Sequence, residues 1–174
     1  MDFSLAELVN HMGGSMVSAG ADRLLGAGRA GVPQIVAPGA TDMVDYPAWG
    51  TVPERFASRP SHAHNRLIAS VTIDPAMRRE VAREIMRRLQ VATGPTALLL
   101  PLGGIEEWDR AGRPMHDAQG LTAFMDELVA LPAGKVDVRT LDAHINDAAF
   151  AHAALAVLDT WVAEGLVPAG RRSV

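Results

Sequence analysis

The stretch Thr96-Ala97-Leu98-Leu99-Leu100-Pro101 decides the fold class of this chain. It is a continuous apolar run of strand length that leads directly into Gly103-Gly104. Strands buried on both faces have such uninterrupted apolar sequences, and they are typical of parallel sheets with helices on either side. The run therefore predicts a central strand of a parallel sheet.

Apolar periodicity on either side of this run predicts that strands alternate with helices. We expect helices at residues 5–12, 21–30, 75–92, 119–131 and 148–163. We expect strands at residues 16–19, 33–37, 67–73, 96–101 and 136–141, the last one nearer a sheet edge because polar residues alternate along it. About five strands in this order imply a three-layer α/β/α fold with a mostly parallel sheet, Rossmann-like but incomplete.

The remaining segments set the expected domain organisation. Residues 41–66 should form a long ordered loop, because proline and glycine interrupt every apolar run while Trp49 and Phe56 can anchor it. The chain has the 174 residues of one ordinary domain. We therefore expect a single α/β domain over residues 1–164 and a frayed tail over residues 165–174.

Composition excludes several classes of function. The 16 basic and 20 acidic residues give a net charge of −4, which argues against binding to nucleic acid or to an anionic membrane. Cysteine is absent, so disulfides, thiolate metal sites and cysteine nucleophiles are excluded. The start of the chain does not resemble a secretion signal, and no run of 18 apolar residues occurs. These features predict a cytoplasmic protein with a small-molecule ligand.

A binding site is expected where the parallel strands end, because open α/β sheets keep their ligands at that edge. The loops that should meet there contain Pro38-Gly39, Asp42, Gly103-Gly104 and residues 142–147. The backbone N–H groups of Gly103-Gly104 could approach a phosphate or carboxylate, since glycine has no Cβ to block them. The alternative is that these two glycines only form a tight turn.

The sequence Asp142-Ala143-His144-Ile145-Asn146-Asp147 gathers the most polar groups at this edge. His144 is the best candidate for a general acid or base, because imidazole titrates near neutrality. Asp142 could fix the tautomer of His144, and Asp147 could be a second functional carboxylate beside the Asn146 amide. The alternative is that Asp147 or Asn146 caps the last helix while Asp142 and His144 brace neighbouring loops.

A second polar group, His62-Ala63-His64-Asn65, lies in the long loop. Its two imidazoles could face a divalent metal, but an isolated His-x-His pattern is common, and we assign no metal ligand. His64 and Asn65 remain candidate ligand-binding residues.

Seven motifs taken in order resemble one known family. They are residues 18–24, 28–36, 38–44, 51–56, His64-Asn65, 101–104 and 142–147. Together they resemble the C-terminal part of an uncharacterised two-domain protein family that includes a plant tobamovirus-resistance ATP-binding protein, over about residues 2–158. Members of that family are about twice as long and carry an N-terminal α/β domain and a glycine-rich stretch before the matched region.

The resemblance implies ATP or Mg²⁺ as the cofactors to consider. It also implies a complementary N-terminal domain or chain as partner, in a homo-oligomer or hetero-oligomer, and a sheet edge exposed for that partner.

Three functions follow from these observations. The first is a ligand-binding module that contributes part of a nucleotide or phosphorylated-metabolite site, which a partner chain or domain completes. The second is an enzyme with His144 as acid or base and with Asp142 and Asp147 as orienting or metal-binding carboxylates. The third is a structural or assembly subunit without a site of its own.

Overall fold

The apolar run of residues 96–101 forms strand β5 (Thr96–Pro101), and every residue of this strand is buried. In the computed structural model, which describes residues 1–15 and 17–170, β5 lies between β1 (Gln34–Val36) and β6 (Asp137–Leu141). Both pairings are parallel, with Gln34 opposite Thr96 and Leu98 opposite Val138. The prediction of a central parallel strand is therefore confirmed, and β6 is an edge strand as expected.

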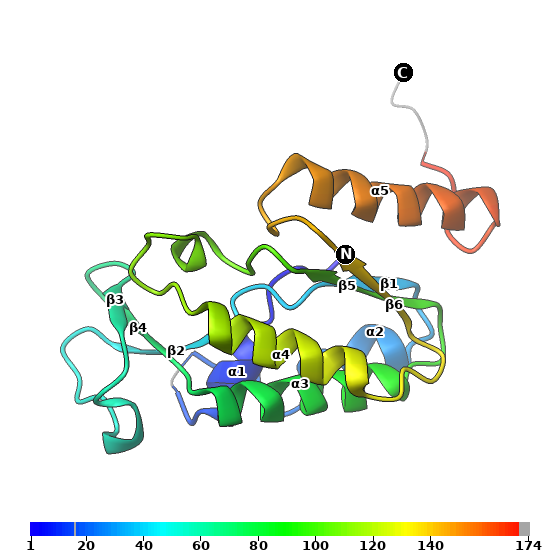
Figure 1. Ribbon diagram of the computed structural model, residues 1–174. Coiled ribbons are helices and arrows are strands. Elements are labelled where there is room, and N and C mark those ends of the chain that lie inside the picture. The colour runs from blue at the N-terminus through cyan, green and yellow to red at the C-terminus, as the bar shows by residue number, and fades with distance from the viewer. Residues whose placement is uncertain (16, 171–174) are drawn as a thin grey trace.

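Helices cover both faces of this sheet (Figure 1). Helix α5 (Ala148–Ala163) lies on one face, and α3 (Pro75–Gln90) with α4 (Ala118–Ala130) lies on the other. Side chains of β5 alternate between the two layers: Ala97 and Leu99 pack with α5, whereas Leu98 and Leu100 join the larger core. Three layers are thus present around the parallel strands.

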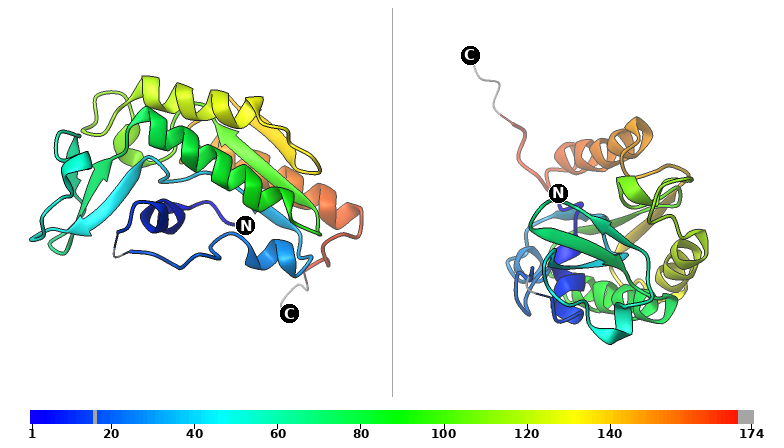
Figure 2. Two further views of the ribbon diagram at one scale, coloured as in Figure 1. Left: turned by 90° about the horizontal axis from the view of Figure 1, so that it is seen from below. Right: turned by 90° about the vertical axis from the view of Figure 1, so that its left-hand side faces the viewer.

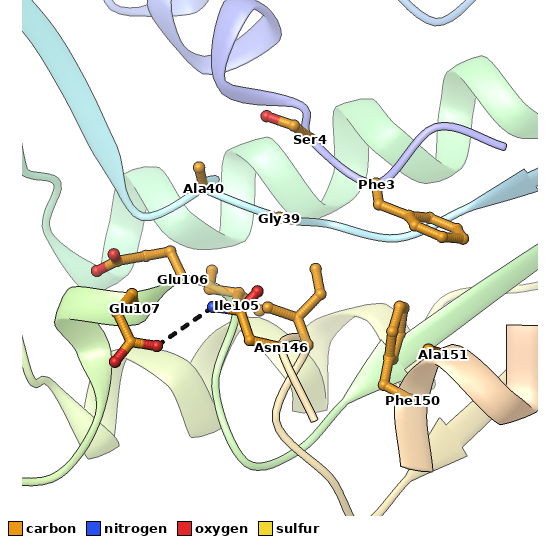
Figure 3. A pocket seen from close by; sticks show the side chains of 11 residues that line it. Phe3, Ser4, Gly39, Ala40, Ile105, Glu106, Glu107, Asn146, Phe150 and Ala151 are labelled. Atoms are coloured by element: carbon orange, nitrogen blue, oxygen red, sulfur yellow. Dashed lines mark hydrogen bonds between the residues drawn. The ribbon is translucent and has the colours of Figure 1, made fainter. Parts of the chain in front are cut away.

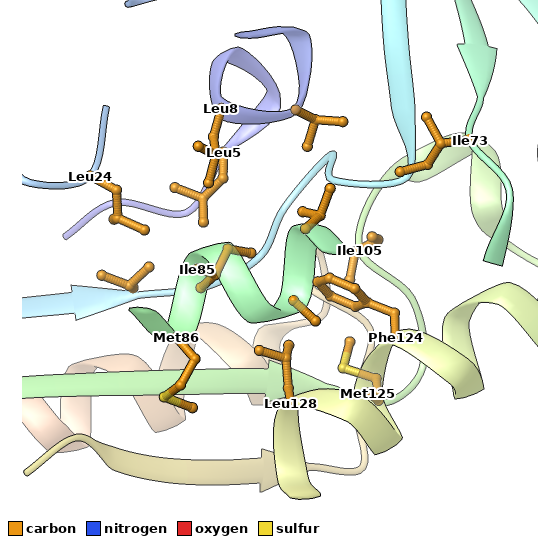
Figure 4. Close-up of a cluster of buried hydrophobic side chains, with 14 of the residues drawn as sticks. Leu5, Leu8, Leu24, Ile73, Ile85, Met86, Ile105, Phe124, Met125 and Leu128 are labelled. Atoms are coloured by element: carbon orange, nitrogen blue, oxygen red, sulfur yellow. The ribbon is translucent and has the colours of Figure 1, made fainter. Parts of the chain in front are cut away.

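Helices α3 and α4 contribute several of the side chains of the larger core (Figure 4). Ile85 and Met86 of α3 meet Phe124 and Leu128 of α4, all nearly inaccessible to solvent. Helix α3 begins as predicted, because the Asp74 side chain accepts a hydrogen bond of 2.8 Å from the Met77 N–H and proline follows at the first helical position.

A second sheet corrects the predicted topology (Figure 2). Strands β2 (Met43–Pro47), β4 (Ile68–Thr72) and β3 (Ser61–Ala63) form an antiparallel sheet in the order β2-β4-β3. The expectation of about five strands in one mostly parallel sheet is wrong: the predicted strand at 67–73 is β4 of the second sheet. The predicted long loop at 41–66 contains β2, β3 and the short 3-10 helix η1 (Glu54–Phe56).

Two prolines in this segment lie at strand ends and do not prevent strand formation. Pro47 is the last residue of β2, and Pro60 directly precedes β3. Proline is compatible with such terminal positions, where it interrupts few ladder hydrogen bonds.

The N-terminal region has less regular structure than its sequence predicts. Helix α1 (Ala6–Met12) forms, but the predicted helix at 21–30 shortens to α2 (Gly26–Arg29) because Leu24 has a φ of 74°. Residues 17–19 of the predicted strand are not in a strand, and Met16 lies outside the described residues. Side chains there bond the backbone: Ser15 Oγ accepts from the Val17 N–H and Ser18 Oγ from the Gly20 N–H.

Residues 165–170 follow α5 without helix or strand, and residues 171–174 of the predicted tail lie outside the described residues. None of the helices in the described ranges is long and apolar enough to cross a membrane.

Candidate functional site

The loops that follow β1, β5 and β6 meet at the carboxyl edge of the parallel sheet, as predicted. Backbone hydrogen bonds tie them together: Ala40 N–H donates to the Ile105 carbonyl at 3.0 Å, and Ile145 N–H donates to the Gly104 carbonyl at 3.0 Å. The three strand ends therefore form one connected surface.

Gly103-Gly104 packs against the loop after β6. A Cβ at Gly103 would lie 2.9 Å from the Ala143 carbonyl carbon, and a Cβ at Gly104, whose φ is 134°, would clash with the His144 ring and the Asp109 carboxylate. The Gly103 N–H already donates to the Ala143 carbonyl at 2.9 Å. The Gly103 N–H is therefore not available to a phosphate, and the glycine pair forms a close-packed turn.

His144 is buried, with 3% of its surface exposed. Its Nδ1 lies 3.1 Å from the Asn146 N–H, and its Nε2 lies 2.9 Å from the Glu106 carbonyl and 3.1 Å from Asp109 Oδ1. Because Nδ1 accepts, we assign the proton to Nε2. The carboxylate that fixes the tautomer is therefore Asp109, not the predicted Asp142, and both ring nitrogens have protein partners.

The other residues of this cluster differ in exposure and bonding. Asp142 is exposed. Asp147 holds the N-cap position of α5, and its carboxylate accepts from the His144 N–H at 2.9 Å and from Arg110 at 3.2 Å. These two bonds, first that from His144, lower the pKa of Asp147. Asn146 is exposed and donates to Glu107 at 3.4 Å.

Two adjoining pockets of about 370 and 460 Å³ lie along this edge. They share four lining residues, Ser4, Ala40, Glu106 and Glu107, and we call the two together the carboxyl-edge groove. Figure 3 shows the first pocket, where Glu106 and Glu107 lie at one end and Phe3 and Phe150 at the other. Among the predicted site residues, Gly39 and Asn146 line this pocket.

The apolar end of the first pocket is rigid. Phe3 and Phe150 meet edge to face with ring centroids 5.4 Å apart. Gly39 passes so close to the Phe3 carbonyl that no Cβ would fit between them. Pro38 precedes it as a buried residue whose carbonyl accepts from Thr41 Oγ1 at 2.8 Å.

The second pocket lies between the two sheets and carries the aromatic side chains. His64 and Trp108 line it, with ring centroids 5.2 Å apart, and His62 packs on the same indole at 4.4 Å. Polar groups from the antiparallel sheet face it too, since Ser70 donates to Asp45 Oδ1 at 2.6 Å.

Metal binding gains no support from the described residues, which contain no group of three or more His, Asp or Glu arranged to hold an ion. Asn65 is exposed and shapes a turn, because its Oδ1 accepts from the Leu67 and Ile68 N–H groups at 2.7 and 2.9 Å.

Glu106 is the residue that sequence reasoning missed. Its Oε2 accepts from the Trp108 N–H at 2.6 Å, whereas its Oε1 is buried without a hydrogen-bond partner among the described residues. Burial raises the pKa of Glu106 to about 8, with further contributions from the charges of Asp42, Asp109 and Glu107. At neutral pH this side chain is mostly a carboxylic acid, able to donate as well as accept.

Asp42, a predicted ligand residue, lies beneath the surface and lines neither pocket. It is fully buried, and its Oδ2 is 3.9 Å from Arg78 Nη2. Burial raises the pKa of Asp42 to about 6 despite Arg78. Its contribution to the groove is therefore electrostatic, because its charge opposes ionisation of Glu106.

One sequence signal pointed to Glu106. Residues Ile105-Glu106-Glu107 directly follow the glycine pair at the end of β5, which is where a site is expected. Adjacent acidic residues in a loop are usually solvated, and nothing in the sequence separates the partly buried Glu106 from the exposed Glu107.

The groove favours hydroxyl, amino or cationic groups over bare phosphate. Three carboxyl side chains line it, from Asp45, Glu106 and Glu107, and no lysine or arginine does so among the described residues. Carboxylates accept hydrogen bonds and repel phosphate at close range.

Comparison with known proteins identifies the family. Residues 1–162 match the C-terminal domain model of an uncharacterised protein family, UPF0261. The chain is 54% identical over 169 residues to a UPF0261 protein of Brucella melitensis, covering 97% of this chain and 40% of that relative. It is 32% identical over 152 residues to a UPF0261 protein of Clostridium tetani, covering 87% of this chain and 38% of that protein.

A plant relative matches more distantly. The tomato ToMV resistance protein Tm-1(GCR237) is 26% identical over 155 residues, covering 88% of this chain and 21% of that protein. The chain thus belongs to the UPF0261 family and corresponds to its C-terminal domain, which confirms the resemblance seen in the motifs. It spans about 40% of the length of the Brucella relative.

Proposed function

We propose that this chain is a small-molecule binding module that supplies the base-binding and ribose-binding part of a nucleotide site. The observation that carries the proposal is the carboxyl-edge groove, in which a carboxyl oxygen of Glu106 has no hydrogen-bond partner among the described residues and lies beside the aromatic side chains of the second pocket. A buried polar atom without a partner costs free energy that a ligand hydrogen bond would recover.

The carboxyl groups suit a ribose. Glu107, whose pKa is lowered first by the hydrogen bond from Arg110, can accept from hydroxyl groups, as an acidic residue does for the ribose in dinucleotide-binding folds. Protonated Glu106 adds a donor that a hydroxyl or ring-nitrogen acceptor can use.

The aromatic side chains suit a base. Trp108 is half-buried, lines the second pocket beside His64, and contacts the imidazoles of His62 and His64. Stacking of a base on such a ring contributes roughly 1–3 kcal/mol.

The phosphate-binding part would come from elsewhere in the larger protein. Gly103 has no free N–H for a phosphate, and the groove is acidic. Since this chain corresponds to 40% of the Brucella relative, the remaining 60% can provide the basic or backbone donors that phosphates require.

Calorimetry with adenosine and with ATP, each with and without Mg²⁺, tests the proposal on this chain. We expect adenosine to bind with a dissociation constant of about 1 mM or tighter, and ATP to bind no more tightly. Glu106→Leu and Trp108→Leu should each weaken adenosine binding about fivefold or more, because they remove the donor and the stacking surface.

Two matched variants control for general effects. Glu80→Leu removes an exposed carboxylate on α3, and Trp49→Leu removes a tryptophan that is 72% exposed outside the groove. Neither should change adenosine binding. Absence of adenosine binding, equal weakening by the control variants, or much tighter binding of ATP than adenosine would each contradict the proposal.

A second candidate is an enzyme in which Glu106, and not His144, transfers the proton. The raised pKa of Glu106 and its position on the groove favour this role, since a general acid works best when its pKa lies near the working pH. Catalysis by Glu106 would be supported if the basic limb of the pH–rate profile shifts to lower pH in Asp42→Asn. Binding without turnover would support the binding module instead.

A further inference from the structure

One residue, Asp2, already pairs with the outer edge of β1 as a residue of an additional parallel strand would. The Asp2 N–H donates to the Ile35 carbonyl at 2.9 Å, and the Ala37 N–H donates to the Asp2 carbonyl at 3.0 Å. Asp2 and Val36 thereby form an isolated parallel bridge on the side of β1 that faces away from β5.

Arg23 holds the chain in this position. Its guanidinium contacts both carboxylate oxygens of Asp2 at 2.6 and 2.9 Å, and it donates to the Ser4 carbonyl at 2.7 Å. Such a bidentate contact fixes direction as well as position. The backbone at Asp2 therefore runs parallel to β1, and its N-terminal side points toward Gln34.

A groove of about 330 Å³ continues this line past Met1. Its walls include Leu24, Ala27 and the residues Val32, Pro33 and Gln34 that lead into β1. Two large apolar side chains at the groove are left to solvent, with Met1 58% and Val32 51% exposed. A strand in this groove would cover both.

The backbone of β1 limits the length of such a strand. Gln34 N–H bonds toward β5, so the alternate residues Ile35 and Ala37 present their N–H and C=O groups outward. Pro33 is the next outward residue and has no N–H, so the regular ladder ends there. The outward backbone groups of β1 can therefore pair with about two more residues beyond Asp2. At about 3.3 Å per residue, a strand of this length also fits the groove.

The opposite edge of the sheet lacks these features. Strand β6 exposes Asp137 and Arg139, which pair at 2.7 Å. Charged side chains on an edge strand oppose pairing with another strand. Of the two edges of the described parallel sheet, the β1 edge is the one shaped to accept another strand.

We propose that the outer edge of β1 binds an extended peptide segment parallel to β1, supplied by the part of the larger UPF0261 proteins that lies before the matched C-terminal domain. The family model places this chain at the C-terminal side, and about 60% of the Brucella relative is not matched by this chain. The docked segment would become the fourth strand of the sheet β1-β5-β6.

This surface lies at the N-terminal end of β1, whereas the carboxyl-edge groove lies beyond its other end. The docking proposal therefore does not depend on the ligand, and adenosine is left out of its test.

The test uses the portion of the Brucella melitensis relative that precedes the matched region, produced as a separate polypeptide. Hydrogen exchange of this full chain is followed by NMR as that polypeptide is added. We expect exchange of the Ile35 amide to slow at least tenfold, with the Arg139 amide unchanged. Val32→Asp should weaken the association at least tenfold, because it places a charge in the groove.

Val129→Asp is the matched control, because Val129 is 57% exposed on α4, away from β1. It should leave the association unchanged. Absence of association, association that leaves Ile35 exchange unchanged, or equal effects of the two variants would overturn the proposal. Protection of Ile35 in this chain alone, accompanied by dimers in sedimentation, would also overturn it by identifying a second copy as the occupant.

Discussion

The loops after β6 and after β5 differ in the number of polar groups they carry and in how many of those groups remain free. Residues 142–147 bring two aspartates, a histidine and an asparagine to the carboxyl edge, yet His144 and Asp147 are bonded to other protein groups. The loop after β5 brings Glu106, which keeps one carboxyl oxygen without a hydrogen-bond partner in the part of the chain that the structure describes. A site is identified by unsatisfied polar capacity beside a pocket, not by the density of polar residues.

The largest effect expected from this comparison is structural. Gly104→Ala should lower the free energy of unfolding by about 2–5 kcal/mol, because the new methyl would clash with His144 and Asp109 at a φ of 134°. Urea denaturation measures the change. At Gly112, where φ is 82°, an added Cβ would meet no atom within 4 Å. Gly112→Ala should therefore cost only about 1 kcal/mol. Equal losses would show that the two loops are not tightly packed.

His144→Ala should destabilise the protein by about 2–4 kcal/mol. The substitution leaves the Asn146 N–H, the Glu106 carbonyl and Asp109 Oδ1 without this partner in a buried place. Thermal and urea unfolding give the value, and His152→Ala, at an exposed position on α5, should stay within about 0.5 kcal/mol. A stable His144→Ala protein would instead support a functional role for His144.

The pH dependence of stability should distinguish Glu106 from the carboxylates of the other loop. Its pKa is raised in the folded state, so the folded protein binds more protons and stability falls as pH rises from about 4.5 to about 8. Asp42 adds a fall between about 4 and 6. Glu106→Gln should remove the upper part of this dependence, an effect on the order of 1 kcal/mol.

Chemical denaturation at pH 5, 7 and 9 provides the measurement. Asp147→Asn should behave differently, because the pKa of Asp147 is lowered and its contribution is lost only as pH falls. If Glu106→Gln and wild type show the same dependence above pH 5, Glu106 does not carry the raised pKa.

The smallest effect is expected at Asn146. Asn146→Ala should change the free energy of unfolding by less than about 0.5 kcal/mol, because the side chain is exposed and its bond to Glu107 is 3.4 Å long. A loss above 1 kcal/mol in urea would show that the loop after β6 depends on this contact.

The sequence predicted those elements whose signals are local. The apolar run of β5 and the Asp74-Pro75 start of α3 were confirmed, because burial on both faces and capping act over a few residues. The antiparallel sheet was missed because Pro47 and Pro60 mark strand ends, and pairing with β4 is decided by residues distant in the chain.

The same distinction applies to the site. The meeting of the loops after β1, β5 and β6 was predicted correctly, since it follows from strand order, while a site at this edge stays a prediction. The predicted partner of His144 was wrong because Asp109 lies 35 positions earlier in the chain. The pKa of Glu106 is raised first by burial and then by the charge of Asp42, which comes from the loop after another strand. Long-range contacts of this kind leave no periodic signal in a single sequence.

Carbon-13 NMR of the Glu106 side-chain carboxyl, assigned by loss of its signal in Glu106→Gln, tests the central claim most directly. We predict an apparent pKa of about 8, a lower value in Asp42→Asn, and a shift of this signal when adenosine is added. A pKa near the ordinary glutamate value of about 4.3, with no response to adenosine, would contradict the claim that Glu106 is a free buried acid in a ligand groove.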